Sequence, residues 1–427
     1  MNISPESVEL LIHDISVQGE GIGRSSDGRV VFVPECYPGD RVRVQITGSR
    51  GRAAVGVCSE MLELSKDRVE SVCTVTVCDG CGLRGIQHDL QLQLKAKRVL
   101  DAFKRLGGVD ASSVFGGIHC AGEPWYYRHR VRLHSEWSGK QYNFGYRARG
   151  SHQLVSLSRC PVLWPELEKG TVGLCDGLKD LPASLRITTV ALAYSRRDGR
   201  LVAQIQSEAA VTLWDPHLDN LLNMGLAGVD VVGRDGRRMR GKVRLRYDHA
   251  YADAFDLCFE PGMFTQACPA VSDLLVSAVQ SHARPETGAC IVEYHAGIGT
   301  FSLPMARLGA HVTAIEINKA ASVLLASNAR NAGLDISAVC VSDHQALSYL
   351  ENASVVVMDP PRSGAALLVQ AIPTSKVHRV VMVSCDPATL ARDGRQLISS
   401  GFQLASLDAY DMFAQTLHVE SVAVFER

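Results

Sequence analysis

The chain has 427 residues, which suggests two to four domains, and 46% of them are apolar, which is ample for packed cores. A formal net charge of -1 excludes a uniformly basic protein but leaves room for local basic patches. The chain start lacks the features of a signal peptide, and no apolar run approaches the roughly 18 residues of a membrane span. Thirteen cysteines without an export signal indicate thiols and metal ligands, so we expect a cytoplasmic protein without membrane contact.

Residues 1–62 predict a small all-β domain. Short strands, such as Val30–Val33 and Arg41–Ile46, alternate with glycine-rich turns. Strands this short and this closely spaced favour a small β-barrel. Acidic and basic residues are balanced here, so charge alone does not indicate nucleic-acid binding, and a solubilising appendage is the alternative.

Three cysteines that follow the barrel predict a metal centre. Cys73, Cys78 and Cys81 lie within nine residues, with Gly80 between the last two and Gly82 directly after them. With a fourth thiolate they would suit zinc or an iron–sulfur cluster. A zinc ribbon normally has two Cys-x-x-Cys pairs, and a single pair favours the cluster. The candidates for the fourth ligand are Cys120 and Cys160, of which Cys160 has the better context because a proline follows it. Chance clustering of structural cysteines is the alternative.

The middle segment, residues 63–260, reads as an α+β domain made mostly of strands. Its one clear helix covers residues 87–107, where apolar residues recur at helical spacing and Gly107–Gly108 ends the pattern. This helix could also pack on the C-terminal domain.

Two basic runs in the middle segment indicate contact with RNA or DNA. In the first, basic side chains alternate along one strand among aromatic residues, which offers phosphate contacts and stacking surfaces for unpaired bases. One run is usually a solvated surface, but two runs in a chain of near-zero net charge favour nucleic-acid contact. The first run holds Trp125, Tyr126, Tyr127, Arg128, Arg130, Arg132, His134, Trp137, Arg147 and Arg149; the second holds Arg234, Arg237, Arg238, Arg240, Lys242, Arg244 and Arg246.

From about residue 261 to 427 strands and helices alternate. This pattern is typical of a doubly wound α/β domain with a mostly parallel sheet. The predicted strands cover residues 289–293, 311–316, 354–358, 377–383 and 422–425, and the predicted helices cover residues 300–307 and 319–331.

A glycine-rich turn in this domain predicts a cofactor site. Gly297-Ile-Gly299 sits where a strand turns into a helix, so the backbone can approach a ligand closely. Glu316 ends the next strand, at the spacing expected of an acid that binds a ribose. The third glycine of the dinucleotide fingerprint is Ser302 here, and no phosphate-binding turn follows. S-adenosylmethionine, which has a ribose but no phosphates, therefore fits better than a nicotinamide cofactor.

Three further side chains are expected at the same edge of the sheet. Asp359, followed by two prolines, comes after the strand predicted over residues 354–358, and Cys385, in Ser384-Cys385-Asp386-Pro387, follows the strand predicted over residues 377–383. A cysteine just past a strand end can project into a ligand cleft as a nucleophile, although a packed thiol is the simpler explanation. Glu420, which precedes the last strand, could be a general base or an ordinary exposed glutamate.

Taken together, these motifs resemble the uracil-5-methyltransferases of RNA, especially the iron–sulfur branch that modifies 23S rRNA. The resemblance covers nearly the whole chain. It is carried by Gly19-Glu-Gly21-Ile-Gly23, Val33-Pro34, Pro38-Gly39-Asp40, the cysteines Cys73, Cys78, Cys81 and Cys160, Phe264-Thr-Gln266, Gly297-Ile-Gly299, Glu316, Asp359-Pro-Pro-Arg362, Ser384-Cys385-Asp386-Pro387 and His418-Val-Glu420.

The resemblance implies an S-adenosylmethionine-dependent methyltransferase with an RNA-binding TRAM barrel and a [4Fe-4S] cluster. Cys73, Cys78, Cys81 and Cys160 would hold the cluster, as a structural clamp. Cys385 would add to carbon-6 of uracil, which makes carbon-5 nucleophilic, and Glu420 would then remove the carbon-5 proton. Cofactor contacts are implied for Gln266, His295, Thr300, Glu316, Asp343 and Asp359.

Other functions are compatible with the same motifs. The RNA could be tRNA, or the base could be cytosine, since cytosine-5-methyltransferases also use a cysteine nucleophile. A non-catalytic RNA-binding iron–sulfur protein is the alternative outside the enzymes. RNA is the one partner implied; nothing in the sequence calls for an obligate protein partner.

Overall fold

The computed structural model describes residues 6–75, 77–78, 80–148, 151, 153–156 and 158–427 and divides into two compact units. The first unit comprises the chain up to Lys97 together with Phe413–His418, and the second comprises Arg98–Met412 and Val419–Arg427. Arg149, predicted in the first basic run, lies outside the described residues. Over the described ranges, no helix is long and apolar enough to cross a membrane.

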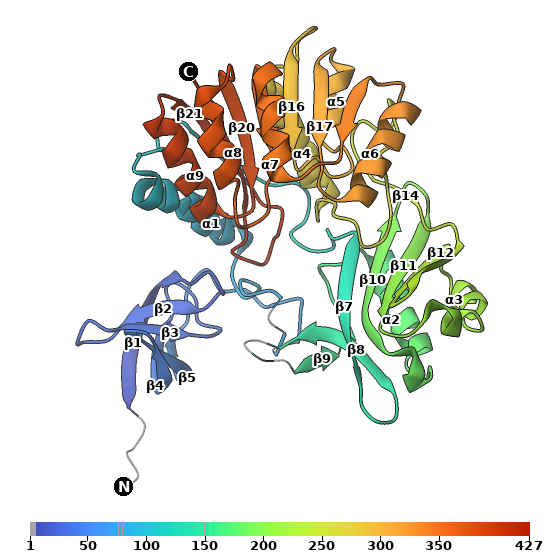
Figure 1. Ribbon diagram of the computed structural model, residues 1–427. Coiled ribbons are helices and arrows are strands. Elements are labelled where there is room, and N and C mark those ends of the chain that lie inside the picture. Colours follow the sequence, from blue (N-terminus) through green and yellow to red (C-terminus); the bar gives the residue numbers. More distant parts are fainter. Residues whose placement is uncertain (1–5, 76, 79, 149–150, 152, 157) are drawn as a thin grey trace. The chain divides into compact units, whose positions relative to one another are not determined.

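The first unit begins with a closed five-stranded barrel, drawn in blue in Figure 1. Every second residue of a strand points inward, and the inward residues, such as Val42 and Val44, form the barrel core. Glycine is required at Gly21, because a Cβ there would lie 2.4 Å from the carbonyl oxygen of Cys36. The predicted small barrel is therefore confirmed. Its strands, in the order β1-β2-β3-β5-β4, are β1 (Ser7–Ile15), β2 (Gly21–Arg24), β3 (Val30–Val33), β4 (Arg41–Arg50) and β5 (Ala53–Glu63).

The predicted helix is also present. Helix α1 (His88–Ala102) continues into a π-helical turn, η1 (Phe103–Gly107), and Gly108 ends it in the left-handed conformation with φ 69°. The division between the two units falls inside α1, after Lys97.

Within the first unit, α1 binds a segment from near the C-terminus, residues 413–418. Gln91, which is buried, donates from Nε2 to Oε1 of Gln415 at 3.0 Å and accepts from the Gln415 N–H at 2.9 Å. Lys95, also buried, donates to the carbonyl of Phe413 at 3.0 Å. These polar groups satisfy one another inside an apolar cluster that includes Leu417.

The second unit holds two sheets. The first has seven strands in the order β13-β12-β11-β10-β7-β8-β9, which agrees with the predicted α+β middle segment rich in strands. Its elements are β7 (Arg130–Trp137), β8 (Tyr142–Arg147), β9 (Leu154–Ser156), α2 (Pro165–Leu178), η2 (Ala183–Leu185), β10 (Ile187–Ser195), β11 (Arg200–Ser207), η3 (Val211–Trp214), α3 (Leu218–Asn223), β12 (Gly228–Gly233) and β13 (Gly236–Gly241).

The second basic run covers the edge strand β13 and the residues next to it, and most of its arginines lie in ion pairs. Arg237 pairs with Asp230 and Glu260 at 2.6 and 2.8 Å. Arg238 pairs with Asp215 at 2.6 Å. Arg240 and Arg244 likewise pair with carboxylates, at 2.7 and 3.1 Å. The run therefore presents much less positive charge than its sequence suggests, because acids distant in the chain neutralise it.

The second sheet has eight strands in the order β18-β17-β16-β19-β20-β22-β21-β6. Strands β18 to β20 are parallel, as predicted, whereas β22 runs antiparallel to both β20 and β21. In Figure 1 the yellow, orange and red helices lie beside this sheet. Its elements are β6 (Phe115–His119), α4 (Pro269–Ala283), β16 (Cys290–Tyr294), α5 (Ser302–Arg307), β17 (His311–Ile315), α6 (Lys319–Asn331), β18 (Ile336–Val339), α7 (Asp343–Ala346), η4 (Leu347–Asn352), β19 (Val355–Met358), α8 (Ala366–Ala371), η5 (Ile372–Thr374), β20 (Arg379–Ser384), α9 (Pro387–Ser399), β21 (Gln403–Tyr410) and β22 (Glu420–Glu426).

The central strands of this sheet are buried along their whole length. All four residues of β19 and all six of β20 are buried, as expected of parallel strands covered on both faces. Val99 and Phe103 belong to the same apolar core as Val380 and Phe425. Two short strands, β14 (Leu245–Arg246) and β15 (Cys258–Phe259), pair with each other and complete the unit.

Candidate active site

The polar residues predicted at one edge of the eight-stranded sheet do lie at strand ends. The chain leaves β16 toward β17 on one side and reaches β19 on the other, so the carboxyl end of β16 is the switch point where such sheets bind ligands. Asp359 follows β19 and Cys385 follows β20. Glu420 begins the antiparallel β22, where the next residue, Ser421, pairs with Ser384. Because β22 runs antiparallel to β20, the start of β22 lies at the same edge of the sheet as the end of β20.

The glycine-rich turn after β16 has a left-handed backbone. His295, Gly297 and Gly299 have φ angles of 60°, 57° and 99°. A Cβ at Gly299 would lie 2.4 Å from Cδ1 of Leu303, whereas a Cβ at Gly297 would meet no atom within 4 Å. The chain is therefore closely packed behind Gly299 and open at Gly297, which leaves space for a ligand next to the backbone.

Glu316, at the end of β17, is tied to this turn. Its carboxylate accepts from the N–H of Gly297 at 2.8 Å and from the N–H of Asn318 at 2.7 Å. Two backbone donors fix the orientation of the side chain. A carboxylate fixed in this way beside an open turn is suited to accept hydrogen bonds from a ribose.

His295, Thr300 and Asp343 surround the same turn. His295 and Thr300 are half-buried, and Asp343 is exposed at the start of α7. Burial lowers the pKa of His295, and the charges of Asp343 and Glu316 act in the opposite direction. His295 therefore lies within electrostatic reach of both acids.

Glu293 lies behind the turn and is buried. It accepts a hydrogen bond from the Ser302 hydroxyl. Burial raises its pKa to about 8 from an ordinary value of 4.5, and the charges of Asp359 and Glu316 act in the same direction. From the sequence, Glu293 was only an acidic residue at the start of the glycine motif. In the structure, the surroundings of its carboxyl group favour the neutral form at pH 7.

Gln266 connects the middle sheet to this edge. Its backbone carbonyl accepts hydrogen bonds from the ring nitrogen of His129 at 3.0 Å and from the Tyr247 hydroxyl at 3.3 Å. Its side-chain Nε2 donates to Asp359 at 3.2 Å. The side-chain oxygen Oε1 is buried and has no hydrogen-bond partner in the described part of the chain. A buried acceptor of this kind fits a ligand with an N–H or O–H group, such as S-adenosylmethionine.

Asp359 and Glu420 are neighbouring carboxyl groups with raised pKa values. Enclosure of the half-buried Asp359 raises its pKa to about 7. Burial and the charge of Asp359 raise the pKa of Glu420 well above 4.5, while Arg362 acts in the opposite direction. Oε2 of Glu420 has no hydrogen-bond partner among the residues described. Like charges in a dry environment oppose each other's ionisation, so these groups bind protons more tightly than exposed carboxylates do.

Cys385 is half-buried at the end of β20 and faces these groups. Burial and the charge of Glu420 raise the pKa of its thiol, and Arg362 lowers it through its charge and a hydrogen bond. The following residue, Asp386, caps α9 by accepting from the N–H groups of Ala388 and Thr389 at 2.9 and 3.0 Å. This cap fixes the turn that carries the thiol.

Comparison with known proteins agrees with this geometry. Three family profiles match, described as TRAM domain (residues 6–57), TRM5/TYW2 methyltransferase domain (279–385) and tRNA (uracil-5-)-methyltransferase (346–427). The 23S rRNA (uracil(1939)-C(5))-methyltransferase of Methylococcus capsulatus is 31% identical over 98% of this chain and 96% of its own length. The enzyme of that description from Halomonas elongata is 32% identical over 98% of this chain and 89% of its own. The chain belongs to the RNA uracil-5-methyltransferases.

This chain is also similar in fold to a protein of known structure. The tRNA (uracil-54, C5)-methyltransferase of Pyrococcus abyssi, solved with S-adenosyl-L-homocysteine, is 22% identical and aligns with a TM-score of 0.75. The alignment covers 98% of this chain and 100% of that chain. The two proteins therefore share a fold over nearly all of this chain.

Two arginines near Cys385 were not recognised as site residues in the sequence. Arg362 follows Asp359 in the Asp-Pro-Pro-Arg motif, and it opposes the raised pKa of both Cys385 and Glu420. Burial lowers the pKa of Arg98, and the charges of Asp386 and Cys385 act in the opposite direction. The Asp-Pro-Pro-Arg motif could have identified Arg362 as a residue of the site. Arg98 could not have been identified, because in the sequence it is only one of several basic residues on an amphipathic helix.

Arg130 differs from its predicted role. The alternating pattern of β7 suggested phosphate contacts, but Arg130 donates to the carbonyl of Thr265 from Nε at 3.1 Å and from Nη2 at 2.7 Å. Its guanidinium also lies 5.4 Å from the ring centre of Phe264, which is exposed. Burial lowers the pKa of the neighbouring His129 to about 3, so this histidine is neutral at pH 7. Both residues position the chain around Gln266.

The four predicted cluster ligands belong to different units. Cys73, Cys78 and Cys81 are in the first unit and Cys160 in the second. The N–H of Gly80 donates to Sγ of Cys78 at 3.4 Å, a type of contact that suits a metal-bound thiolate. Searched over the described ranges, no group of three or more His, Cys, Asp or Glu side chains is arranged to hold a metal ion. Residues 76 and 79 of the cysteine loop lie outside those ranges.

Replacing Glu293 by glutamine tests whether this carboxyl is held neutral. A folded-state pKa of about 8 against 4.5 in the unfolded chain contributes stability that is fully present below pH 4.5 and lost as the pH rises to 8. Glu293→Gln removes that loss and can still bond to Ser302. We expect its Tm, relative to the unaltered protein, to rise across this pH range. Parallel Tm curves would contradict the assignment, and Glu351→Gln, at an exposed position, is the control.

Proposed function

We propose that this enzyme methylates carbon-5 of one uridine in 23S rRNA. The supporting observation is the similarity to relatives of that description, which extends over 98% of the chain and so includes the barrel and the middle sheet as well as the methyltransferase sheet. A target base must leave its stack to reach a half-buried thiol. We place the enzyme in the cytoplasm, where a catalytic cysteine stays reduced.

The cofactor in this proposal is S-adenosylmethionine, held by Gln266, His295, Thr300, Glu316, Asp343 and Asp359. When bound, it supplies an electrophilic methyl group on a sulfonium. Glu316 would accept the ribose hydroxyls, because its carboxylate is already fixed by two backbone N–H groups. The unpartnered Oε1 of Gln266 would accept from the ligand, while Nε2 keeps its bond to Asp359.

Cys385 is the proposed nucleophile. Its sulfur forms a bond to carbon-6 of the uracil, and the electron pair of the 5,6 double bond moves to give an enolate. Carbon-5 of that enolate is then nucleophilic enough to take the methyl group. Arg362, which favours the thiolate of Cys385, also offers a positive charge near the place where the enolate develops.

Glu420 is the proposed general base. After methylation, carbon-5 carries both a methyl group and a proton. The Glu420 carboxylate takes that proton, the double bond re-forms, the carbon–sulfur bond breaks and Cys385 leaves as a thiolate. A buried carboxyl group with a raised pKa is a stronger base than an exposed one, which suits this step.

A [4Fe-4S] cluster held by Cys73, Cys78, Cys81 and Cys160 completes the proposal. The donor set of four thiolates is the chemistry that such clusters require. We assign the cluster a structural role, and no catalytic step uses it.

The purified enzyme should transfer a labelled methyl group from S-adenosylmethionine to 23S rRNA that lacks modifications. Cys385→Ala should abolish the transfer while S-adenosylmethionine still binds, because the thiol contacts the base and not the cofactor in this mechanism. The readout is incorporated label, mapped to the nucleotide, together with calorimetric cofactor binding. Label in unmodified tRNA instead of 23S rRNA would overturn the proposed substrate, and turnover by Cys385→Ala would overturn the mechanism.

Glu420→Gln should accumulate a covalent protein–RNA adduct. Methylation precedes proton removal, so without the base the methylated intermediate stays bonded to Cys385. The measurement is a slower band on denaturing electrophoresis that requires both RNA and S-adenosylmethionine. Glu351→Gln should form no such band. Absence of the adduct in Glu420→Gln would place the base elsewhere.

Replacing Cys160 by serine should remove most of the iron and inorganic sulfide from anaerobically purified protein. Cys120→Ser is the matched control, because Cys120 was the other candidate for the fourth ligand and is exposed. Loss of iron in Cys120→Ser but not in Cys160→Ser would exchange the assignments. Zinc without sulfide in the unaltered protein would exclude the cluster.

A further inference from the structure

The second unit contains a cleft of about 750 Å³ that the proposed chemistry does not use. Its walls include aromatic, cationic and carboxylate side chains, whereas Cys385, Glu420 and Glu316 do not line it. The volume falls in the range of sites for small organic ligands. The side chains that could contact a ligand there include Trp125, Tyr126, Trp164, Arg196, Asp248 and His249.

One wall is aromatic and held in place by the backbone. Tyr126 has a φ of 53°, and its N–H donates to the carbonyl of Pro161 at 2.8 Å. The N–H of Tyr127 donates to Val162 at 3.0 Å, and that of Trp164 donates to Arg128 at 2.9 Å. Tyr126 nevertheless remains 38% exposed. A fixed and accessible aromatic surface is what stacking of an unpaired base needs.

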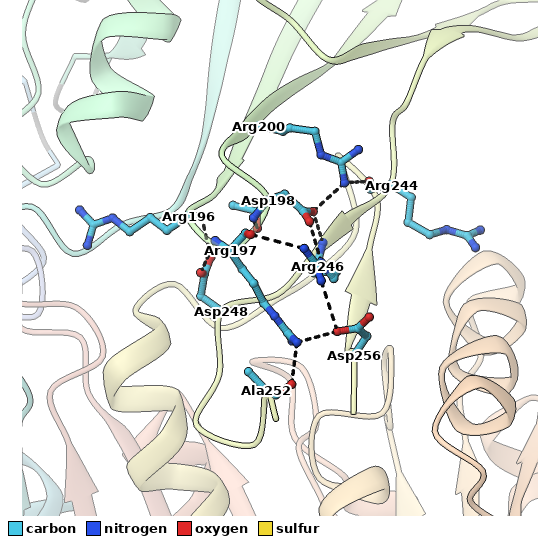
Figure 2. A network of polar contacts seen from close by, with 10 residues as sticks. Arg196, Arg197, Asp198, Arg200, Arg244, Arg246, Asp248, Ala252 and Asp256 are labelled. Carbon is cyan, nitrogen blue, oxygen red and sulfur yellow. Dashed lines mark hydrogen bonds and ion pairs between the residues drawn. The ribbon is translucent and has the colours of Figure 1, made fainter. Parts of the chain in front are cut away.

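Arg196 adds a planar cation to this wall. Its guanidinium carbon lies 4.1 Å from the ring centre of Trp164, and 48% of its side chain is exposed. In Figure 2 the side chain extends away from the surrounding network, in which Arg197 and Arg246 contact Asp256. The guanidinium also pairs with the carboxylate of Glu166 at 3.5 Å. The outer face of the guanidinium is therefore available to a second planar group.

The lining also contains a buried hydrogen-bond acceptor, on His249. Burial and the charge of Arg197 lower the pKa of His249 to about 4, so its ring is neutral at pH 7. The ring stacks on Phe255 and bonds to the backbone there. Nε2 has no hydrogen-bond partner within the described ranges. Asp248, next to it, accepts from the N–H groups of Arg196 and Arg197 at 3.1 and 2.9 Å.

The chain of the cleft floor continues from the proposed active site. Cys268, Pro269 and Ala270 line the cleft, and Cys268 is two residues beyond Gln266, whose side chain binds Asp359. Two residues of extended chain span at most about 7 Å. The cleft lining therefore begins within about 7 Å of Gln266, a residue of the proposed active site.

We propose that this cleft binds a second unpaired base of the RNA, one with an exocyclic amino group, close to the methylated uridine. The base stacks against the wall formed by Trp125, Tyr126 and the Arg196 guanidinium, and its amino group donates to the imidazole of His249 or to Asp248. Adenine and cytosine present such a donor, whereas uracil presents a carbonyl at the corresponding position. This inference rests on the proposed function, because it takes the ligand to be part of the RNA substrate. It does not depend on which RNA is modified.

Fluorescence anisotropy with labelled hexa-adenylate, hexacytidylate and hexauridylate tests the proposal. The full-length enzyme should bind the first two more tightly than hexauridylate. Trp125→Ala and Arg196→Ala should each weaken hexa-adenylate binding by about tenfold, as loss of one stacked base does. Trp125→Phe should restore most of the affinity. His249→Phe should reduce the preference for adenylate over uridylate and leave hexauridylate binding unchanged.

A matched control lies outside the cleft and outside both basic runs. Arg186 is exposed and ion-paired with Glu208, so Arg186→Ala should leave the adenylate preference intact. Equal affinities for the three oligonucleotides, or no measurable binding, would overturn the proposal. The proposal would also be overturned if the cleft variants had the Tm of the unaltered protein and bound the oligonucleotides with its affinities.

Failure of this inference and failure of the proposed function have different signatures. If Trp125→Ala and Arg196→Ala methylate 23S rRNA with unchanged KM and kcat, the cleft assignment is wrong while the proposed function stands. If the unaltered enzyme methylates no rRNA but keeps its adenylate preference, the cleft assignment stands and the substrate must be another RNA. A raised KM with unchanged kcat in the cleft variants supports the inference.

Discussion

Removal of water from three carboxyl groups is the constraint on which the active edge of the sheet depends. Glu293, Asp359 and Glu420 lie at or near the ends of β16, β19 and β22, and burial raises the pKa of each. Water would ionise them and screen Arg362, the cation that acts on both Cys385 and Glu420. The fully buried β19 and β20 keep water out on both faces of the sheet. The apolar core therefore sets the proton affinities on which the proposed chemistry relies.

The middle sheet contributes to the same environment through the backbone. His129 and Arg130, from a run that looked like a phosphate-binding strand, bond to the carbonyls of Gln266 and Thr265. These bonds fix the backbone at Gln266, whose side-chain amide donates to Asp359. A positively charged sequence can thus serve to hold a neutral segment in place, and charge alone does not separate that role from binding of nucleic acid.

Local patterns predicted the elements well, and contacts between distant residues could not be predicted. Helix α6 has the bounds predicted for it, residues 319–331, and β3 has its expected bounds, residues 30–33. The sequence also placed Cys385, Asp359 and Glu316 at strand ends. It could not indicate that Arg237 pairs with Glu260, or that Arg98 lies near Cys385, because no periodicity or motif relates residues so far apart.

The path of the chain bears on how this architecture could change in evolution. The backbone passes from one unit to the other three times, after Lys97, Met412 and His418. A barrel joined by a single linker could be exchanged or lost by recombination at one point. Here the loop that ends two residues before Glu420 makes its hydrogen bonds to Gln91 and Lys95 in the first unit. Gain or loss of the N-terminal unit would therefore require a compensating change in the β21–β22 loop, so the two must be inherited together.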